Sequence, residues 1–159
     1  RVDALDLSEA MMAQCRAKIG KFKLGTRVHF KQANARELPF SDETFDVVYN
    51  GYMFDLIPLD GSLPILNEMA RVLKPGGKLA LVNMSKRNTR RTFFDTMYEK
   101  GLPVGPCRPV LMHPYLELAG FVDSERIYRP NHVGFIPLPF GTEIVLARKP
   151  ARAPKDRQT

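Results

Sequence analysis

Asp6 is the first residue whose type and position could do chemistry, because it is an acid at the end of a strand-like stretch, residues 1–7. Ser8 and Glu9 follow it and are typical of a helix start, since Ser is a favoured N-cap and Glu suits the positive end of the helix dipole. An acid between a strand and a helix lies at the carboxyl edge of a sheet, where open α/β folds bind ligands, and its carboxylate can accept hydrogen bonds from both hydroxyls of a ribose. The alternative is an Asp that serves only the helix entry.

Four further side chains stand where a substrate would meet the sheet edge. Tyr52 and Asp55 follow an apolar strand-like segment, residues 45–50, and His113 and Tyr115 precede the next-to-last strand. Such groups can act as general acids or bases toward a bound ligand. Each also has a packing alternative, because a tyrosine can bury its ring with a satisfied hydroxyl and His113, followed by Pro, can simply start a helix.

Motifs of several other enzyme classes are absent from the sequence. It contains no G-x-x-x-x-G-K-[ST] phosphate loop, no G-x-S-x-G nucleophile elbow, no H-E-x-x-H and no G-x-G-x-x-G. The two cysteines, Cys15 and Cys107, are far apart, with no CxxC and no neighbouring His. A disulfide framework and a metal site are therefore not expected, and a reducing compartment, the cytoplasm, is expected.

The net charge of +7, from 24 Lys and Arg against 17 Asp and Glu, is concentrated in two stretches. KRNTRR (residues 86–91) and residues 148–159 together hold more than the whole excess. Positive charge in one loop and a tail, without interleaved aromatics, argues against a nucleic-acid surface. We expect one domain over residues 1–149 and a basic, disordered tail over 150–159, either solvated or an arm for acidic partners. No apolar run approaches the roughly 18 residues of a membrane-spanning helix.

Alternating strand-like and helical patterns predict the elements that position these residues. Helices are expected from Ser8 to Gly20 and, with Ser62 as its cap, over residues 62–73, where apolar residues recur at helical spacing. KPGG (residues 74–77) should end this second helix and direct the chain into a strand. The other expected helices are 89–100 and 113–119, and the expected strands are 1–7, 27–33, 45–50, 78–84, 121–128 and 142–148.

The last connection, residues 129–141, determines the direction of the final strand. It contains Pro130, Pro137 and Pro139, so the crossover helix that a parallel neighbour needs does not fit there. The last two strands should therefore be antiparallel. The sequence predicts an α/β fold with an open, mostly parallel sheet, an antiparallel last strand and helices on both faces.

Three segments carry a resemblance to a known family: RVDALDLSEAMM, then ANARELPFSDETFDVVYNGYMFDLIP, then LNEMARVLKPGGKLALVNM. In this order they resemble the class I S-adenosylmethionine-dependent methyltransferases, in particular the small-molecule branch that includes the ubiquinone and menaquinone methyltransferases. The match covers residues 1–85 well and continues loosely through LELAGF and the last two strands. The resemblance implies an open Rossmann-like sheet whose first strand and glycine-rich loop are missing, so that an N-terminally truncated chain carries half of a cofactor site and exposes an unpaired strand edge.

The resemblance also implies which residues meet the adenosine part of S-adenosylmethionine. Asp6 matches the acid that holds the ribose, with Leu7 and Met11 beside the adenine. Asn34 matches the position, usually Asp, that bonds the adenine amino group, and Ala35 offers its backbone N–H to the ring. An amide oxygen lacks the charge of a carboxylate, so we expect the bond from Asn34 to be weaker than the family's usual one.

On the methyl side, the resemblance places Asn50 and Gly51 beside the amino-acid part of the cofactor. The implied reaction is methyl transfer to a small-molecule acceptor by in-line displacement, with Tyr52, Asp55 and His113 as the catalytic candidates.

Two other function classes are weighed against this reading. The chain could be a cofactor-binding remnant or pseudoenzyme that acts through protein contacts, or a nicotinamide-dependent dehydrogenase. The antiparallel ending and the KPGG-to-strand context argue against the dehydrogenase. For the acceptor, the resemblance suggests a hydrophobic or quinone-like molecule, and the final connection holds apolar residues that could line its entrance or pack on the sheet: Phe135, Ile136, Leu138 and Phe140. The oligomeric state stays open.

Overall fold

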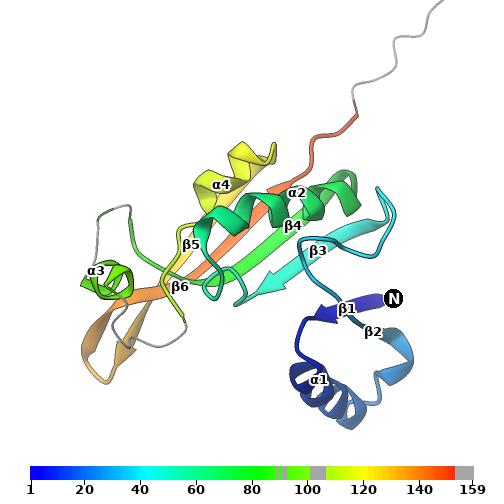
Figure 1. Cartoon of the computed structure of the whole chain (residues 1–159), viewed down its shortest axis with the longest axis horizontal. Coiled ribbons are helices and arrows are strands. Elements are labelled where there is room, and N and C mark those ends of the chain that lie inside the picture. Colours follow the sequence, from blue (N-terminus) through cyan, green and yellow to red (C-terminus); the bar gives the residue numbers. More distant parts are fainter. Residues whose placement is uncertain (89, 91–92, 101–106, 153–159) are drawn as a thin grey trace, which may run out of the picture. The chain divides into compact units, whose positions relative to one another are not determined.

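The computed structural model describes residues 1–88, 90, 93–100 and 107–152, and the chain divides into two compact units, residues 1–40 and 41–159 (Figure 1). The single domain expected over residues 1–149 stays a prediction. Residues 153–159 of the expected tail lie outside the described residues.

The first unit is a β-α-β unit. It consists of β1 (Val2–Asp6), α1 (Glu9–Lys21), a 3₁₀ turn (Gly25–Arg27) and β2 (Val28–Gln32), and β1 and β2 pair in parallel from Val2↔Val28 to Asp6↔Gln32. A crossover helix is what two parallel neighbours require.

The predicted start of α1 is confirmed and its predicted end is not. The Ser8 hydroxyl accepts a hydrogen bond from the Met11 N–H at 3.3 Å, as a helix N-cap does. The helix runs through Gly20, however, and ends at Lys21. The chain leaves it through Lys23, whose positive φ of 56° allows the Lys23 N–H to bond the Gly20 carbonyl at 3.1 Å. A left-handed residue after the last turn therefore ends this helix, and the glycine does not.

The second unit contains a four-stranded sheet with the order β3-β4-β6-β5. Its elements are β3 (Phe45–Gly51), a 3₁₀ turn (Leu59–Gly61), α2 (Ser62–Val72), β4 (Leu73–Ser85), α3 (Phe93–Glu99), α4 (His113–Leu118), β5 (Val122–Val133) and β6 (Ile136–Arg148). β3 and β4 are parallel, and β6 is antiparallel to both β4 and β5. The expected reversed last strand in an otherwise parallel sheet is therefore confirmed.

The core of this unit lies between the sheet and helices α2 and α4. Leu79 and Leu81 of β4 and Val145 of β6 are buried on the same face of their strands, and Leu66 of α2 and Leu116 of α4 are fully buried as well. The apolar stripe predicted for α2 is thus the stripe that packs. Alternate residues of β3, such as Val47 and Tyr49, are more than half exposed, because neighbouring side chains of a strand point to opposite faces.

Two details of the predicted boundaries are corrected. Ser62 does not cap α2: its backbone is already helical and its buried hydroxyl has no hydrogen-bond partner among the described residues. The preceding 3₁₀ turn, closed by Gly61 N–H to Pro58 C=O at 3.0 Å, brings Ser62 into the helix, so its side chain cannot reach the cap position. KPGG does end α2, but it already belongs to β4, where Gly76 has a φ of +76° and its N–H bonds the Lys149 carbonyl at 3.0 Å.

The last two strands are longer than predicted. The segment expected to be an irregular connection, residues 129–141, continues β5 and β6 up to a turn at Gly134 and Phe135. The pairing of β4 with β6 ends at Ser85↔Gly141, so beyond that point β6 has a neighbouring strand on one side only. Prolines, which lack an N–H to donate, can be accommodated in such an edge position.

No helix among the described residues is long and apolar enough to cross a membrane.

Within the described residues, β1 pairs only with β2 and β3 only with β4, so β1 and β3 each leave one edge unpaired.

Candidate functional site

The carboxyl edge of the first unit holds the residues expected at the adenosine. Asp6 ends β1, and its Oδ1 accepts the Ser8 backbone N–H at 2.8 Å. The ends of the two strands are tied together, because the Ala33 N–H bonds the Asp6 carbonyl at 3.3 Å and the Gln32 amide donates to the Leu7 carbonyl at 2.8 Å. Asp6 therefore serves the helix entry with one oxygen, and its second carboxylate oxygen accepts no hydrogen bond among the described residues.

Apolar side chains lie beside this acid. Leu7 is 66% exposed and Met11 53% exposed, although both are large and hydrophobic. Asp6 and Met11 also line a small hollow of about 80 Å³, together with side chains of both strands and of α1, among them Phe30. Exposed apolar surface next to a carboxylate is what an aromatic ring joined to a sugar requires.

Asn34 follows β2 at the same edge, and part of its hydrogen-bonding capacity is used within the protein. Its Oδ1 accepts the Arg36 backbone N–H at 3.0 Å, which is an Asx turn. One lone pair of that oxygen and the two amide hydrogens remain for a ligand, since an amide side chain offers four hydrogen-bond positions. The first unit thus places Asp6 and Leu7 at the end of β1 and Asn34 just after β2, at the same edge, and the adenosine contacts expected of Asp6, Leu7, Met11, Asn34 and Ala35 stay predictions.

In the second unit, Asn50 and Gly51 end β3 and Tyr52 follows. The Asn50 amide nitrogen contacts the Met53 sulfur at 3.6 Å, and its buried Oδ1 has no hydrogen-bond partner among the described residues. Tyr52 adopts a positive φ of 56°, and its N–H bonds the Val82 carbonyl at 2.7 Å. Tyr52 is about half exposed, and its catalytic role stays a prediction.

Asp55 lies inside the protein. The residue is only 3% exposed, and its carbonyl accepts the Arg108 N–H at 2.9 Å. Burial raises the pKa of the Asp55 carboxyl, and hydrogen bonds from the backbone N–H groups of Asp55 and Met84 oppose the shift. Burial, and to a lesser degree the charge of Asp55, also raises the pKa of Cys107.

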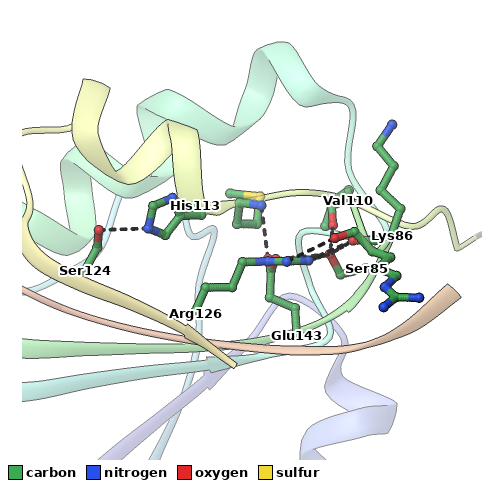
Figure 2. A network of polar contacts seen from close by, with 9 residues as sticks. Ser85, Lys86, Val110, His113, Ser124, Arg126 and Glu143 are labelled. Atoms are coloured by element: carbon green, nitrogen blue, oxygen red, sulfur yellow. Dashed lines mark hydrogen bonds and ion pairs between the residues drawn. The ribbon is translucent and has the colours of Figure 1, made fainter. Parts of the chain in front are cut away.

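His113 is turned toward β5. Its Nε2 lies 3.0 Å from the Ser124 hydroxyl, and Figure 2 shows the ring pointing toward Ser124. The described hydrogen bonds of His113 thus lead to β5 and not to Tyr52 or Asp55. A catalytic role of His113 stays a prediction.

Sequence reasoning missed a buried polar network at the carboxyl end of β4 (Figure 2). Its centre is Glu143 of β6, which is fully buried. Glu143 accepts hydrogen bonds from the Met112 N–H at 3.1 Å and the Ser85 hydroxyl at 3.1 Å, and it forms an ion pair with Arg126 of β5. A signal was present in the sequence: Glu143 alternates with Val145 and Ala147, so it had to lie on their buried face.

This network holds both ends of the segment that connects β4 to α4. Arg126 donates to the Lys86 carbonyl at 2.8 Å and the Arg87 carbonyl at 3.2 Å. On the return, the Val110 N–H bonds the Met84 carbonyl at 3.0 Å, and the Ser85 hydroxyl bonds the Val110 carbonyl. Both ends of the segment are therefore fixed at the sheet edge where β3 also ends. Among the described residues, no three His, Cys, Asp or Glu side chains gather closely enough to hold a metal ion.

Comparisons with known proteins identify the family of this chain. A family model described as a methyltransferase domain matches residues 1–81. A demethylmenaquinone methyltransferase of Halalkalibacterium halodurans is 40% identical over 85 residues, which cover 54% of this chain and 34% of that protein. A phosphatidylethanolamine N-methyltransferase of Cereibacter sphaeroides is 36% identical over 87 residues, which cover 55% of this chain and 42% of that protein.

A solved structure of an S-adenosylmethionine-dependent methyltransferase from Methanosarcina mazei matches 94% of this chain and 82% of its own with a TM-score of 0.73 at 18% identity, a likeness that shows the fold. The matched segments span well under half the length of the two curated relatives. The family model, in contrast, covers more than half of this chain. With its parallel strands, its reversed last strand and this match, the chain belongs to the methyltransferase-domain family and has the fold of the S-adenosylmethionine-dependent methyltransferases.

Proposed function

We propose that this chain is part of an enzyme that transfers a methyl group from S-adenosylmethionine to a small, apolar acceptor. The observation that carries the proposal is the carboxyl edge of the first unit, where Asp6, Leu7 and Asn34 lie together in a chain of this family.

The residues of that edge fit the adenosine part of the cofactor. Asp6 offers a carboxylate oxygen to the ribose hydroxyls, and the exposed side chains of Leu7 and Met11 offer apolar contact to the adenine. Asn34 retains a lone pair and two donors beside the Asx turn. A role of Asn50 beside the amino-acid part of the cofactor stays a prediction; its buried Oδ1 has no hydrogen-bond partner among the described residues and could accept one bond.

When bound, S-adenosylmethionine supplies a methyl group on a positively charged sulfur, which is a good leaving group. The chain's own task is to hold the acceptor in line and to exclude water. Asp6, Leu7 and Asn34 would hold the adenosine part of the cofactor, which would supply the methyl group to the acceptor. Tyr52, half exposed at the end of β3, is the residue we assign to contact the acceptor.

We assign Asp55 as the base that takes a proton from the methyl acceptor. Its buried carboxyl has a raised pKa, which brings a base closer to neutral pH, where proton transfer is most effective. A hydroxyl or acidic carbon acceptor would lose its proton to this carboxylate.

The acceptor class rests on the relatives and the sequence. One relative is named for demethylmenaquinone and another for phosphatidylethanolamine. The chain's net charge of +7 favours a neutral or anionic acceptor. We further propose that the enzyme works in the cytoplasm and acts on no nucleic acid.

Calorimetry with S-adenosylmethionine tests the cofactor assignment. Asp6→Ala should weaken binding roughly 10- to 150-fold, because hydrogen bonds to a charged group contribute about 1.5–3 kcal/mol. Asp3→Asn is the matched control, since Asp3 lies earlier on the same strand and pairs with Arg1. Asn34→Asp should tighten binding through charge assistance.

The measurement should be made on this chain and on a form extended upstream to include the glycine-rich loop that the resemblance implies. Each variant is compared with its parent in the same form. A dissociation constant unaffected by Asp6→Ala in the extended form would leave Asp6 as a helix-entry residue. Cofactor binding without transfer to any acceptor would instead favour a remnant that acts through protein contacts.

A further inference from the structure

The hairpin formed by β5 and β6 projects beyond the rest of the sheet. β4 ends at the register pair Ser85↔Gly141, and Gly141 also pairs with Pro130 of β5. Beyond that point only β5 and β6 pair, up to Val133↔Ile136. Because β5 runs parallel to β4, this ribbon leaves the sheet at its carboxyl edge, the edge at which Asn50 ends β3 (Figure 1).

Two large hydrophobic residues are exposed at the tip of this ribbon. Phe135 has the exposure of a residue with no neighbours, 103%, and Val133 is 63% exposed. Gly134 between them has a positive φ of 58°, which permits the tight turn that separates the two side chains from the ribbon. Single exposed hydrophobic residues are common on proteins, but two at the end of a projecting ribbon form a wedge.

Positive charge lies behind this wedge, toward the place where the ribbon leaves the sheet. The sequence contains no Asp or Glu from Arg126 through Thr142, and Arg129 on the ribbon is exposed. Arg87 and Arg90 are exposed on the segment that leaves β4, and the start of that segment is held to β5 because Arg126 donates to the Arg87 carbonyl at 3.2 Å.

We propose that this tip, with Val133 and Phe135 as the wedge and Arg87, Arg90 and Arg129 as basic residues behind it, docks the protein on the surface of an anionic lipid bilayer. An aromatic ring and an aliphatic side chain enter the boundary between headgroups and acyl chains, while arginines contact the lipid phosphates. Charge complementarity identifies the partner as anionic, and the apolar tip distinguishes a bilayer from a purely charged polymer.

Docking at this tip would turn the carboxyl edge of the sheet toward the lipid. An apolar acceptor could then pass from the bilayer to the residues at the end of β3 without crossing water. This consequence rests on the proposed function, whereas the docking itself does not, because it needs neither cofactor nor acceptor.

The chain contains no tryptophan, so Phe135→Trp places a unique fluorophore at the tip. With vesicles of phosphatidylcholine and phosphatidylglycerol, we expect a blue-shifted emission and protection from acrylamide. Pure phosphatidylcholine vesicles should produce a much smaller change. The matched control is Phe22→Trp, because Phe22 is also an exposed aromatic, 74% exposed, at the end of α1, and its emission should not change.

Co-sedimentation with the anionic vesicles measures the partition without any label. Each basic residue near an anionic surface contributes about 1 kcal/mol, or roughly fivefold in partition. The triple variant Arg87→Gln, Arg90→Gln and Arg129→Gln should therefore bind roughly 100-fold more weakly. Phe135→Ser should also lower the partition while leaving the thermal melting curve unchanged, whereas removal of residues 153–159 should have a small effect.

Three results would overturn the proposal. One is tryptophan emission at position 135 that stays unchanged while the protein still sediments with the vesicles. Another is a partition that depends on residues 153–159 and not on the three arginines. The third is polyglutamate producing the same blue shift as the vesicles, which would assign the tip to an acidic protein. None of these results touches cofactor binding, so failure of docking and failure of the proposed reaction can be told apart.

Discussion

The Glu143–Arg126 pair offers the sharpest test of how the second unit is held together. Glu143 is fully buried, whereas the Arg126 side chain is 21% exposed. Removing one partner of a buried ion pair costs about 3–5 kcal/mol because the other charge is left uncompensated. The cost should differ between the two partners, since their surroundings differ.

Glu143→Gln leaves Arg126 with the Lys86 and Arg87 carbonyls as acceptors. We therefore expect a loss of about 3 kcal/mol in the free energy of unfolding, the lower end of the range. Among the described residues, Arg126→Met leaves the Glu143 carboxylate with the Ser85 hydroxyl and the Met112 N–H, and the loss should approach about 5 kcal/mol.

The double variant removes both charges, so its loss should be far smaller than the sum of the single losses. We expect about 3–4 kcal/mol for the double variant, and thus a coupling energy of roughly 4–5 kcal/mol. The pair Glu43–Arg152, with side chains 35% and 74% exposed, is the control, and an exposed pair should couple by about 0–1 kcal/mol.

Urea unfolding followed by circular dichroism supplies the four free energies of each cycle, and hydrogen exchange of the Met112 amide reports the local effect. In Glu143→Ala, which removes the acceptor of that amide, exchange at Met112 should accelerate. Additive losses at Glu143 and Arg126, or a coupling no larger than that of the control pair, would refute the view that burial makes this pair strong.

Two further predictions concern stability. The pKa of the Asp55 carboxyl is raised in the folded state, so the folded protein holds this proton more tightly than the unfolded chain does. The free energy of unfolding should therefore fall as pH rises from the ordinary pKa of 3.8 toward the folded pKa. Asp55→Asn should remove this contribution and be at least as stable as the parent at pH 7; urea midpoints that show the variant losing stability relative to the parent as pH rises would contradict it. Gly76→Ala should cost about 1–2 kcal/mol, because Gly76 has a φ of +76° with no atom near an added Cβ. Gly25→Ala, equally open but without positive φ, should be nearly neutral in the same thermal melts, and equal losses would sink the strain argument.

Local patterns in the sequence were sufficient to predict most of the helices and strands and to place the candidate site residues of the first unit at one edge. The helical spacing of apolar residues located α2 and its buried stripe, and the Ser8 cap located the start of α1. The prolines of the last connection predicted the antiparallel final strand. Asp6, Leu7 and Asn34 could be placed at one edge because a β-α-β unit brings the ends of its two parallel strands together by geometry alone.

Tertiary structure decided what depends on partners distant in the chain. The order β3-β4-β6-β5 places Glu143 beside Arg126 and Ser85, which lie 17 and 58 residues away in sequence. Burial of Asp55 beneath the returning segment at Arg108, and the 3₁₀ turn that draws Ser62 into α2, could not be read from neighbouring residues. A sequence pattern records which face of an element is apolar, but the pKa of a carboxyl and the partner of a buried charge are set by whatever the fold packs against that face.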